Sequence, residues 1–328
     1  MGSWFSLPSW DPKKDLPDLS GKIALVTGAN AGIGYHTAEE LALHGAKVYI
    51  GARSERRAHA AIERLHIENP TLVKGAVVYL PLNLSDLDDV VKAVEVFLQQ
   101  EKRLDILVNN AGMITNKSER TPQGYEATIG VNYMAHFLLT KLLLPTLKAT
   151  ATKEGSNVRI INTSSSGHTM LVPTAMQFNK LDDLQYPGRS QSYPPYSGQR
   201  DLFSRYAVSK VANILHAAEL QRQFDIEKIP IIAASFNPGG NNTEGALSVF
   251  PRWLRPIMSR IMNPPTFGAR PALFLAASPD ATRFKGAYLE HTCQLGSASV
   301  IAKDPQRAKN LWDLSESEID KYLASSSK

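Results

Sequence analysis

Short apolar segments alternate with longer amphipathic ones along most of this chain, and this alternation constrains the fold more than any other feature. The apolar segments have the composition of β-strands and comprise residues 23–27, 47–51, 76–82, 105–109, 158–163 and 230–236. The segments between them have apolar residues at helical spacing and comprise residues 33–45, 54–67, 86–101, 123–149 and 205–225. Strands and helices in this order form βαβ units, whose parallel sheet is covered by helices on both faces. The pattern therefore predicts an α/β fold with one doubly wound parallel sheet.

No change of composition marks a second domain. Residues 1–18 are predicted to be an N-terminal arm, and residues 19–328 to form one domain. Within it, residues 166–202 are rich in Pro, Gly, Ser and Tyr and are predicted to be an insertion. Residues 240–265 carry bulky apolar side chains among arginines and are predicted to be a lid over an apolar site, with a core helix as the alternative. A capping-box pattern at 315–318 predicts a short last helix.

The composition excludes several classes of protein. Hydrophobic residues make up 43% and charged residues 20% of the chain, which is typical of a folded globular protein. The 36 basic and 31 acidic residues are spread along the chain, so no nucleic acid partner is predicted. The eight histidines show no metal-binding spacing, so no metal is predicted. Cys293 is the only cysteine, which fits a reducing compartment, and a cytoplasmic location is predicted.

The sequence leaves contact with a membrane surface open. It has no run of 18 apolar residues, so no transmembrane helix is predicted, and no secretory signal is recognised. Residues 1–6 formally fit the N-myristoylation pattern. That pattern is short and common, and an arm that docks Trp4, Phe5, Leu7 and Trp10 on the protein explains the same residues. The arm and the apolar segment 247–262 also permit peripheral membrane association, although a lid explains that segment equally well.

A glycine-rich segment follows the first predicted strand and opens the first predicted helix. It reads Thr27-Gly-Ala-Asn-Ala-Gly-Ile-Gly34. Glycine allows a tight turn, and backbone N–H groups at a helix N-terminus attract the pyrophosphate of a dinucleotide. The spacing differs from the usual G-x-G-x-x-G fingerprint, so the prediction of a dinucleotide site depends on the position between a strand and a helix.

The second predicted strand ends in a basic residue, Arg53, 19 residues after Gly34. A site for NAD(H) normally has an acidic residue about 20 residues after the glycines, where it binds the ribose 2′-hydroxyl. The guanidinium of an arginine instead pairs with a 2′-phosphate through a planar fork. NADP(H) is therefore the predicted cofactor, and a solvated arginine at the start of a helix is the alternative.

The segment Tyr206-Ala-Val-Ser-Lys210 places a tyrosine and a lysine on one face of a predicted helix. Lowering a tyrosine pKa from its usual value near 10 to about 7 requires roughly 4 kcal/mol. One ammonium group at about 4 Å supplies an energy of that order at an effective dielectric constant near 20. Such a tyrosine can pass a proton to a carbonyl oxygen, or remove one from an alcohol.

Together these motifs resemble those of the classical short-chain dehydrogenases/reductases, from about Leu19 to about His291. The glycine-rich segment is similar to the family's cofactor loop. Further similar segments are Asn109–Gly112, Asn132 in Gly-Val-Asn-Tyr, Ile161–Ser165, and Pro238-Gly239 with Thr243. The residues 27–34, 49–53 and 137–140 look closest to the retinol-dehydrogenase-like branch, which prefers NADP(H) and lipophilic alcohols or carbonyls. The resemblance implies a Rossmann-type sheet.

The resemblance also implies roles for individual residues. Tyr206 would be the general acid/base, and Lys210 would lower its pKa and hold the nicotinamide ribose. Ser165, preferred over the serine on either side of it, would hydrogen-bond the substrate oxygen, and Asn132 would anchor a water of a proton relay. The implied cofactor-binding residues are Gly28, Asn30, Gly32, Ile33, Gly34, Arg53, Asn83, Leu84, Asn110, Ala111, Gly112, Tyr206, Lys210, Pro238, Gly239 and Thr243.

Three features depart from the family pattern. Asn83 stands where an aspartate usually contacts the adenine, and its amide can accept the same hydrogen bond. Asn241 replaces the usual valine of the Pro-Gly-x-Val-x-Thr loop. Ser165 and Tyr206 are 41 positions apart, more than in typical members, so the insertion is expected to loop out near the substrate entrance.

The sequence therefore predicts an NADP(H)-dependent oxidoreductase that interconverts a hydrophobic alcohol and its ketone or aldehyde. Its expected partner is a lipophilic small-molecule substrate. The alternative is a non-catalytic NADP-binding scaffold or sensor, which the presence of Ser165, Tyr206 and Lys210 disfavours. A homodimer that pairs through the helices around 123–149 and 205–225 is the prediction for assembly.

Overall fold

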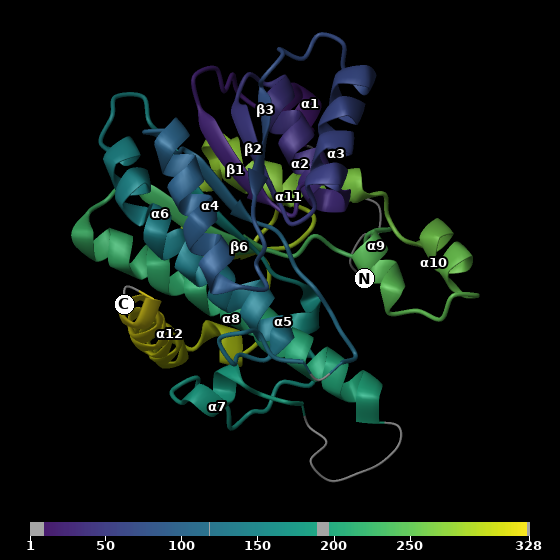
Figure 1. The fold of residues 1–328 in the computed structure, drawn as a ribbon, viewed down its shortest axis with the longest axis vertical. Helices are drawn as coiled ribbons and strands as arrows, with labels where there is room; N and C mark the ends of the chain where they lie inside the picture. The colour runs from purple at the N-terminus through teal and green to yellow at the C-terminus, as the bar shows by residue number, and fades with distance from the viewer. Residues whose placement is uncertain (1–9, 118, 189–196, 327–328) are drawn as a thin grey trace.

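A computed structural model describes residues 10–117, 119–188 and 197–326, and it contains one parallel sheet of seven strands (Figure 1). The strands are β1 (Ile23–Thr27), β2 (Lys47–Ala52), β3 (Val77–Pro81), β4 (Ile106–Asn109), β5 (Val158–Thr163), β6 (Ile231–Phe236) and β7 (Tyr288–Leu289). Their order in the sheet is β3-β2-β1-β4-β5-β6-β7. This order reverses direction between β1 and β4, and ligands of such sheets bind where the order reverses, at the carboxyl ends of the strands. The predicted doubly wound α/β fold is confirmed.

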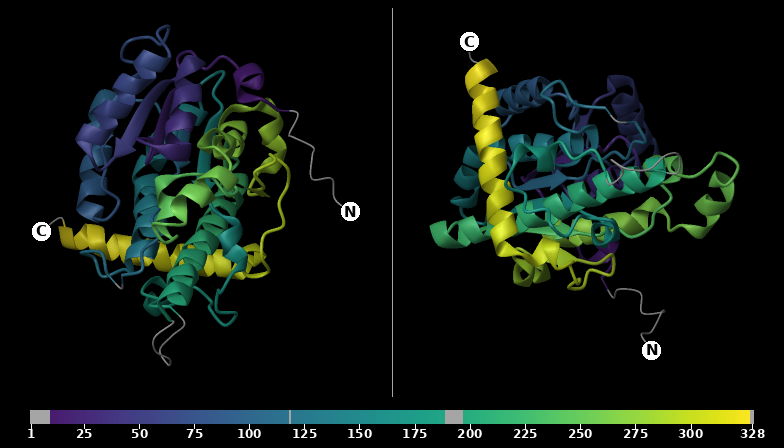
Figure 2. Two further views of the ribbon diagram at one scale, coloured as in Figure 1. Left: turned by 90° about the vertical axis from the view of Figure 1, so that its right-hand side faces the viewer. Right: turned by 90° about the horizontal axis from the view of Figure 1, so that it is seen from below.

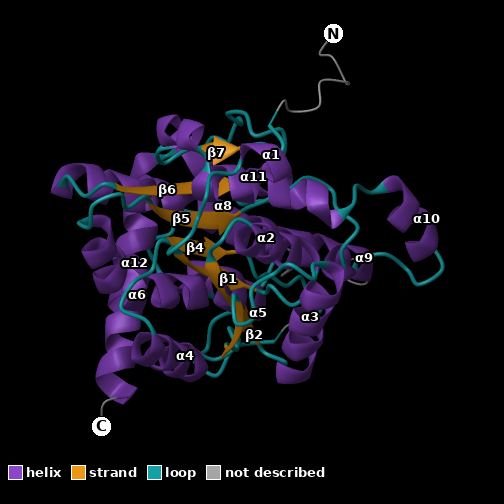
Figure 3. Cartoon of the chain, turned by 90° about the horizontal axis from the view of Figure 1, so that it is seen from above, coloured by secondary structure: helices purple, strands orange, loops and turns teal. Residues whose placement is uncertain are grey.

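Helices cover both faces of the sheet, as Figure 3 shows. The α-helices are α1 (Pro12–Asp15), α2 (Gly32–Leu43), α3 (Glu55–Glu68), α4 (Leu87–Gln100), α5 (Ala127–Ile129), α6 (Ala135–Ala151), α7 (Leu181–Leu184), α8 (Ser197–Glu227), α9 (Glu244–Ser248), α10 (Arg255–Ile261), α11 (Pro265–Ala277) and α12 (Pro305–Ser326). Shorter helical turns are η1 (Gly130–Met134), η2 (Ser166–Thr169), η3 (Pro279–Phe284) and η4 (Ile301–Lys303). One apolar layer packs under α4, α6, α8 and α12, and the other packs under α2, α3 and α11.

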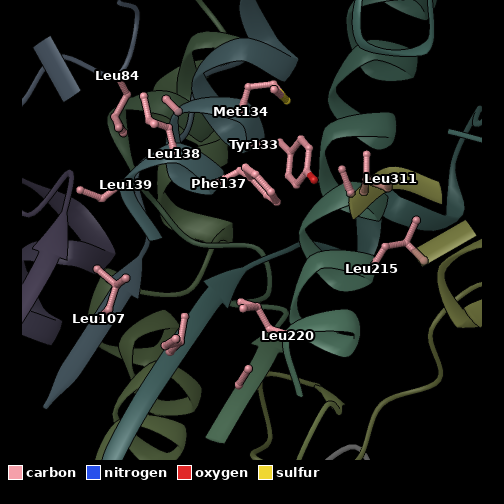
Figure 4. Close-up of a cluster of buried hydrophobic side chains, with 14 of the residues drawn as sticks. Leu84, Leu107, Tyr133, Met134, Phe137, Leu138, Leu139, Leu215, Leu220 and Leu311 are labelled. Carbon is pink, nitrogen blue, oxygen red and sulfur yellow. The ribbon is translucent and has the colours of Figure 1, made fainter. Parts of the chain in front are cut away.

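The strands form where the chain has short apolar runs, because both faces of a parallel sheet are buried. In β5, Ile160 lies in the layer under α8, and Ile161 lies in the layer under α11. Figure 4 shows part of the first layer, where Leu107 of β4 and Leu215 of α8 join one cluster with Leu311 of α12. The sheet places the loops that follow β1, β4, β5 and β6 next to one another, because these four strands are neighbours or near neighbours in it.

The longest apolar helical stretch runs through α5, η1 and α6, from Ala127 to Ala151. It is long and apolar enough to cross a membrane, but 83% of its most apolar part is buried inside the protein. The stretch therefore has the character of a core helix, in which Pro145 lies within α6.

The C-terminal helix differs from its prediction. Instead of a short helix that begins near Ser315, α12 spans 22 residues, and Ser315 lies in its interior. The Ser315 hydroxyl donates to the carbonyl of Leu311, and its oxygen lies 2.7 Å from the Tyr133 hydroxyl oxygen. The side chain therefore bonds to buried groups and does not cap a helix. Figure 2 shows α12 in yellow lying across α8. It covers part of the surface through which a homodimer was predicted, and the dimer stays a prediction.

The N-terminal arm is described from Trp10 onward. The Trp10 ring meets the Phe274 ring of α11 edge-on, with the ring centroids 5.4 Å apart. Leu16 is buried after the short helix α1. The arm is therefore docked on the protein over this part. The myristoylation pattern of residues 1–6 and the side chains of Trp4, Phe5 and Leu7 lie outside the described residues.

Candidate active site

The segment from the end of β1 into α2 is packed so closely that two of its glycines, Gly28 and Gly34, have no room for a side chain. Gly28 and Gly32 have positive φ angles of 66° and 60°. A Cβ atom on Gly28 would lie 2.9 Å from the Cα of Ala111, and one on Gly34 would lie 2.5 Å from the Asn110 Nδ2. No side chain caps the N-terminus of α2. The loop therefore leaves the first N–H groups of α2, at Gly32 and Ile33, to a ligand, and this cradle fits a dinucleotide pyrophosphate.

Thr27 connects this loop to the end of β4. Its hydroxyl oxygen accepts from the backbone N–H groups of Asn110 and Ala111, both at 2.9 Å. The Asn110 side chain donates back to the Thr27 carbonyl at 2.8 Å. These bonds hold the backbone of Asn110 and Ala111 beside the start of the glycine-rich loop.

A buried histidine that the sequence analysis did not identify completes this connection. The His136 Nε2 lies 2.8 Å from the Thr27 hydroxyl, and its Nδ1 lies 3.1 Å from the carbonyl oxygen of Asn132. Because a carbonyl only accepts, Nδ1 carries the proton and Nε2 accepts from Thr27. Burial lowers the pKa of His136 to about 4, so the ring is neutral at pH 7. The spacing of four residues between Asn132 and His136 was the available signal.

Asn132 lies in the π-helical turn η1 and is completely buried. Its Oδ1 accepts from the backbone N–H of Met113 at 2.7 Å, and its Nδ2 donates to the Ser209 hydroxyl at 3.0 Å. A Cβ atom on Gly112 would lie 3.4 Å from the Asn132 Oδ1 and 3.5 Å from the Lys210 Nζ. Gly112 therefore lies beside both of these polar side chains.

Helix α8 brings Tyr206 and Lys210 to the carboxyl end of β5. The Lys210 Nζ lies 5.4 Å from the centre of the Tyr206 ring and donates to the Thr163 carbonyl at 2.9 Å. Ser165 hydrogen-bonds the Tyr206 side chain. The Ser164 hydroxyl instead donates to the Lys210 carbonyl. Ser165 is therefore the serine that meets the phenol, while Ser164 supports the helix.

The loop after β6 is held by a side chain that departs from the family pattern. The Asn241 Nδ2 donates to the carbonyls of Pro238 and Gly239, at 2.7 and 2.9 Å. A Cβ atom on Gly268 of α11 would lie 2.6 Å from this nitrogen, so a glycine there makes room for the amide. Thr243 caps α9, and its methyl group would lie 3.2 Å from a Cβ atom on Gly32. The loops after β1 and β6 thus meet at the site.

Comparison with known proteins agrees with this geometry. The family model of short chain dehydrogenases matches residues 22–178. A short chain dehydrogenase/reductase of Colletotrichum higginsianum, dpchH, is 41% identical over 321 residues, which are 97% of this chain and 79% of the relative. The chain belongs to the short-chain dehydrogenase/reductase family. As a member, it is an oxidoreductase whose cofactor is a nicotinamide nucleotide.

Solved structures of short-chain dehydrogenases/reductases and related proteins have the same fold. A crystal structure of an uncharacterized protein from Mycobacterium paratuberculosis has a TM-score of 0.68 and 29% identity, and the match covers 94% of this chain and 97% of that one. The 3-ketoacyl-(acyl-carrier-protein) reductase from Brucella melitensis, complexed with NADH, has a TM-score of 0.60 and 26% identity. That match covers 83% of this chain and 97% of the reductase.

The protonation of the tyrosine in this dehydrogenase/reductase differs from the prediction. Lys210 was expected to lower the Tyr206 pKa, but in the protein alone burial raises it, and the hydrogen bond to Ser165 only partly opposes this. Burial also lowers the pKa of Lys210 to about 8, because its ammonium group is desolvated and its bonding partner is a carbonyl. Residue spacing shows that two groups are close, but it does not show how completely water is excluded from them. Tyr206 is therefore protonated at pH 7 and able to act as an acid.

Arg53 follows β2, and Asn83 and Leu84 follow β3, at the carboxyl end of the sheet where the resemblance puts the adenine end of the cofactor. Leu84 is buried in the apolar layer under α4. Arg53 is exposed and has no ion-pair partner among the described residues, whereas Arg57 pairs with Glu244 of α9 at 2.6 Å. The Asn83 Oδ1 accepts from the N–H of Ser85 at 3.2 Å. Its Nδ2 donates to Asp89, a carboxylate next to the expected adenine position that the sequence analysis missed.

The insertion follows Ser165 and ends inside α8, whose first turns include residues 197–202. His168 fixes its start, because the ring Nδ1 lies 2.6 Å from the Ser165 carbonyl and Nε2 accepts from the N–H of Ser299. Farther along, a cavity of 980 Å³ is lined by insertion residues together with Arg120. Residues 189–196 of the insertion lie outside the described residues.

Proposed function

We propose that this protein is an NADP(H)-dependent enzyme that interconverts a lipophilic alcohol and its ketone or aldehyde. The observation that carries the proposal is the Ser165–Tyr206 hydrogen bond, with Lys210 behind the tyrosine ring, at the same sheet edge as the glycine cradle. Lipophilic substrates are supported by the resemblance to the retinol-dehydrogenase-like branch in residues 27–34, 49–53 and 137–140. The exposed Arg53 at the end of β2 supports NADP(H).

Some residues of the chain bind the cofactor and the substrate, and others transfer the proton. A bound nicotinamide nucleotide supplies or accepts the hydride. The N–H groups at the start of α2 hold its pyrophosphate, and the loop of Pro238 and Gly239 lies where the nicotinamide end would be held. Ser165 donates a hydrogen bond to the substrate oxygen and thereby orients the carbonyl.

Tyr206 moves the proton. In reduction, the phenol O–H bond breaks and the proton passes to the substrate oxygen as the carbonyl carbon gains the hydride. The charged Lys210 ammonium stabilises the phenolate that forms, and Asn132 anchors the water through which the proton is replaced. In oxidation the same steps run backward, with the phenolate accepting the alcohol proton.

Titration with NADPH and with NADH tests the cofactor, and a panel of lipophilic ketones, aldehydes and alcohols tests the reaction. We expect tight binding of NADPH and a change in nicotinamide absorbance with members of the panel. Tight binding without turnover of any panel member would favour the scaffold alternative. Failure to bind either nucleotide would contradict the proposal, and would show that Asn83 and Asn241 mark a degenerate site.

Charge reversal at Arg53 is expected to weaken NADPH far more than NADH. An Arg53→Asp variant loses a charge-assisted hydrogen bond and places a carboxylate near the 2′-phosphate, so the Kd for NADPH should rise roughly 100-fold. The Kd for NADH should change little. Lys74→Asp is the matched control, because Lys74 is also exposed but precedes β3 at the opposite end of the sheet. Equal weakening of both nucleotides by Arg53→Asp would contradict a role in binding the 2′-phosphate.

A further inference from the structure

The segment 249–262 stands apart from the folded body of the protein. It contains α10, in which no residue is buried. Figures 1 and 3 both show α10 projecting away from the sheet and the helices that cover it, beyond α9. The core-helix alternative for this part of the chain is therefore wrong. The segment starts shortly after Thr243, so it extends from the loop after β6 that contains Pro238 and Gly239.

The projecting segment exposes large apolar side chains on one side. Trp253 is 75% exposed, Ile257 is 51% exposed and Ile261 is 71% exposed. Their spacing of four residues places them on one face of a helix. On a helical wheel of about 100° per residue that includes the turn before α10, these three fall with Leu254 and Met258 within an arc of about 140°.

Basic residues occupy the rest of the same wheel. Arg252, Arg255 and Arg260 all fall outside the apolar arc, and Arg252 and Arg260 are exposed. Between Glu244 and Asp280 the sequence has four arginines and no acidic residue. An apolar face that carries a tryptophan beside an arginine-rich face is the composition of helices that lie in a lipid headgroup layer. The excess of positive charge is complementary to anionic headgroups.

We propose that the segment 249–262 docks this protein on the surface of an anionic phospholipid bilayer. Trp253, Ile257 and Ile261 enter the boundary between headgroups and acyl chains, and Arg252 and Arg260 pair with lipid phosphates or carboxylates. The charge favours this occupant over a second copy of the chain, because two copies would bring like charges together. The segment follows the loop of Pro238 and Gly239, so docking sets this side of the candidate site close to the lipid. The proposal concerns binding alone and holds whether or not the proposed reaction is correct.

Co-sedimentation with vesicles tests the proposal. The full chain is mixed with vesicles of phosphatidylcholine alone, or of phosphatidylcholine with phosphatidylserine. We expect binding to the anionic vesicles that weakens as salt is raised. A variant with Arg252→Glu and Arg260→Glu should bind the anionic vesicles at least about 25-fold more weakly. The loss of each arginine charge is expected to weaken binding about fivefold, and the two effects multiply. A variant with Trp253→Ser, Ile257→Ser and Ile261→Ser should not co-sediment with either vesicle.

A matched control removes equally exposed isoleucines elsewhere. Ile67 is 70% exposed and Ile226 is 67% exposed, so an Ile67→Ser, Ile226→Ser variant should bind as the wild type does. Failure of the wild-type chain to bind anionic vesicles would overturn the proposal. So would equal loss of binding in the control variant, or a dimer in solution that only the α10 variants abolish. Unchanged vesicle binding by the α10 variants with reduced turnover of a water-soluble substrate would overturn it in favour of an active-site lid.

Discussion

A Tyr206→Phe variant is expected to reduce substrate about 10²- to 10⁴-fold more slowly than the wild type, with little change in NADPH affinity. The substitution removes only the hydroxyl, which hydrogen-bonds Ser165 and is the proposed proton donor. Hydride transfer then produces an alkoxide that no neighbouring acid neutralises. The ring itself still packs beside Lys210. Single-turnover absorbance and NADPH titration measure the two effects separately.

Tyr186→Phe provides the matched control for this prediction. The Tyr186 hydroxyl lies 3.0 Å from the Ser204 hydroxyl, and the substitution removes the same group from a tyrosine of the insertion. This variant should keep wild-type turnover. Wild-type turnover by Tyr206→Phe, or equal loss in both variants, would show that Tyr206 is not the proton donor.

The sheet was predictable because burial on both faces leaves a strong signal in the sequence. Each of the six predicted strands begins and ends within one residue of the observed strand. The seventh strand, Tyr288–Leu289, was missed because two residues are too few to show a pattern. Ser315 shows the opposite case, where a local capping pattern was overridden by tertiary contacts with Tyr133 and by the packing of α12 on α8.

The candidate site was predictable where a motif requires particular residues and unpredictable where distant residues meet. Gly28 and Gly34 face backbone or side-chain atoms that leave no room for a Cβ atom. Only glycine fits at these two positions, and the sequence shows this requirement as a glycine motif. Other contacts join residues from separate elements. His136 hydrogen-bonds Thr27, and the Asn241 amide lies against Gly268, where there is no side chain. No spacing rule connects such pairs, and the raised Tyr206 pKa depends on burial that sequence does not report.

Acid is expected to destabilise this protein through two buried histidines. Burial lowers the pKa of His136 to about 4 and that of His216 to about 3, and each positive ring would also repel the other. Between pH 6.5 and pH 4 the unfolded chain binds protons on these residues, while the native protein does not. The free energy of unfolding therefore falls as the pH falls through this window. Each histidine contributes up to about 1.4 kcal/mol per pH unit, or about 3 kcal/mol over the window.

A His216→Phe variant separates this contribution from the titration of carboxylates. His216 packs among the rings of Tyr133, Phe137 and Trp312, and its Nε2 has no hydrogen-bond partner among the described residues. A phenylalanine ring suits these surroundings, and the Asn162 Nδ2 keeps its bond to the Asn213 carbonyl. Urea unfolding at several pH values should show that the variant loses about one proton of pH dependence between pH 6.5 and pH 4. His59→Phe, at a side chain that is 60% exposed, should keep the wild-type slope. If His216→Phe kept the wild-type dependence of unfolding free energy on pH, His216 would have to be protonated in the native protein over this window. A charged ring would need an anionic partner, and the surrounding aromatic rings do not supply one.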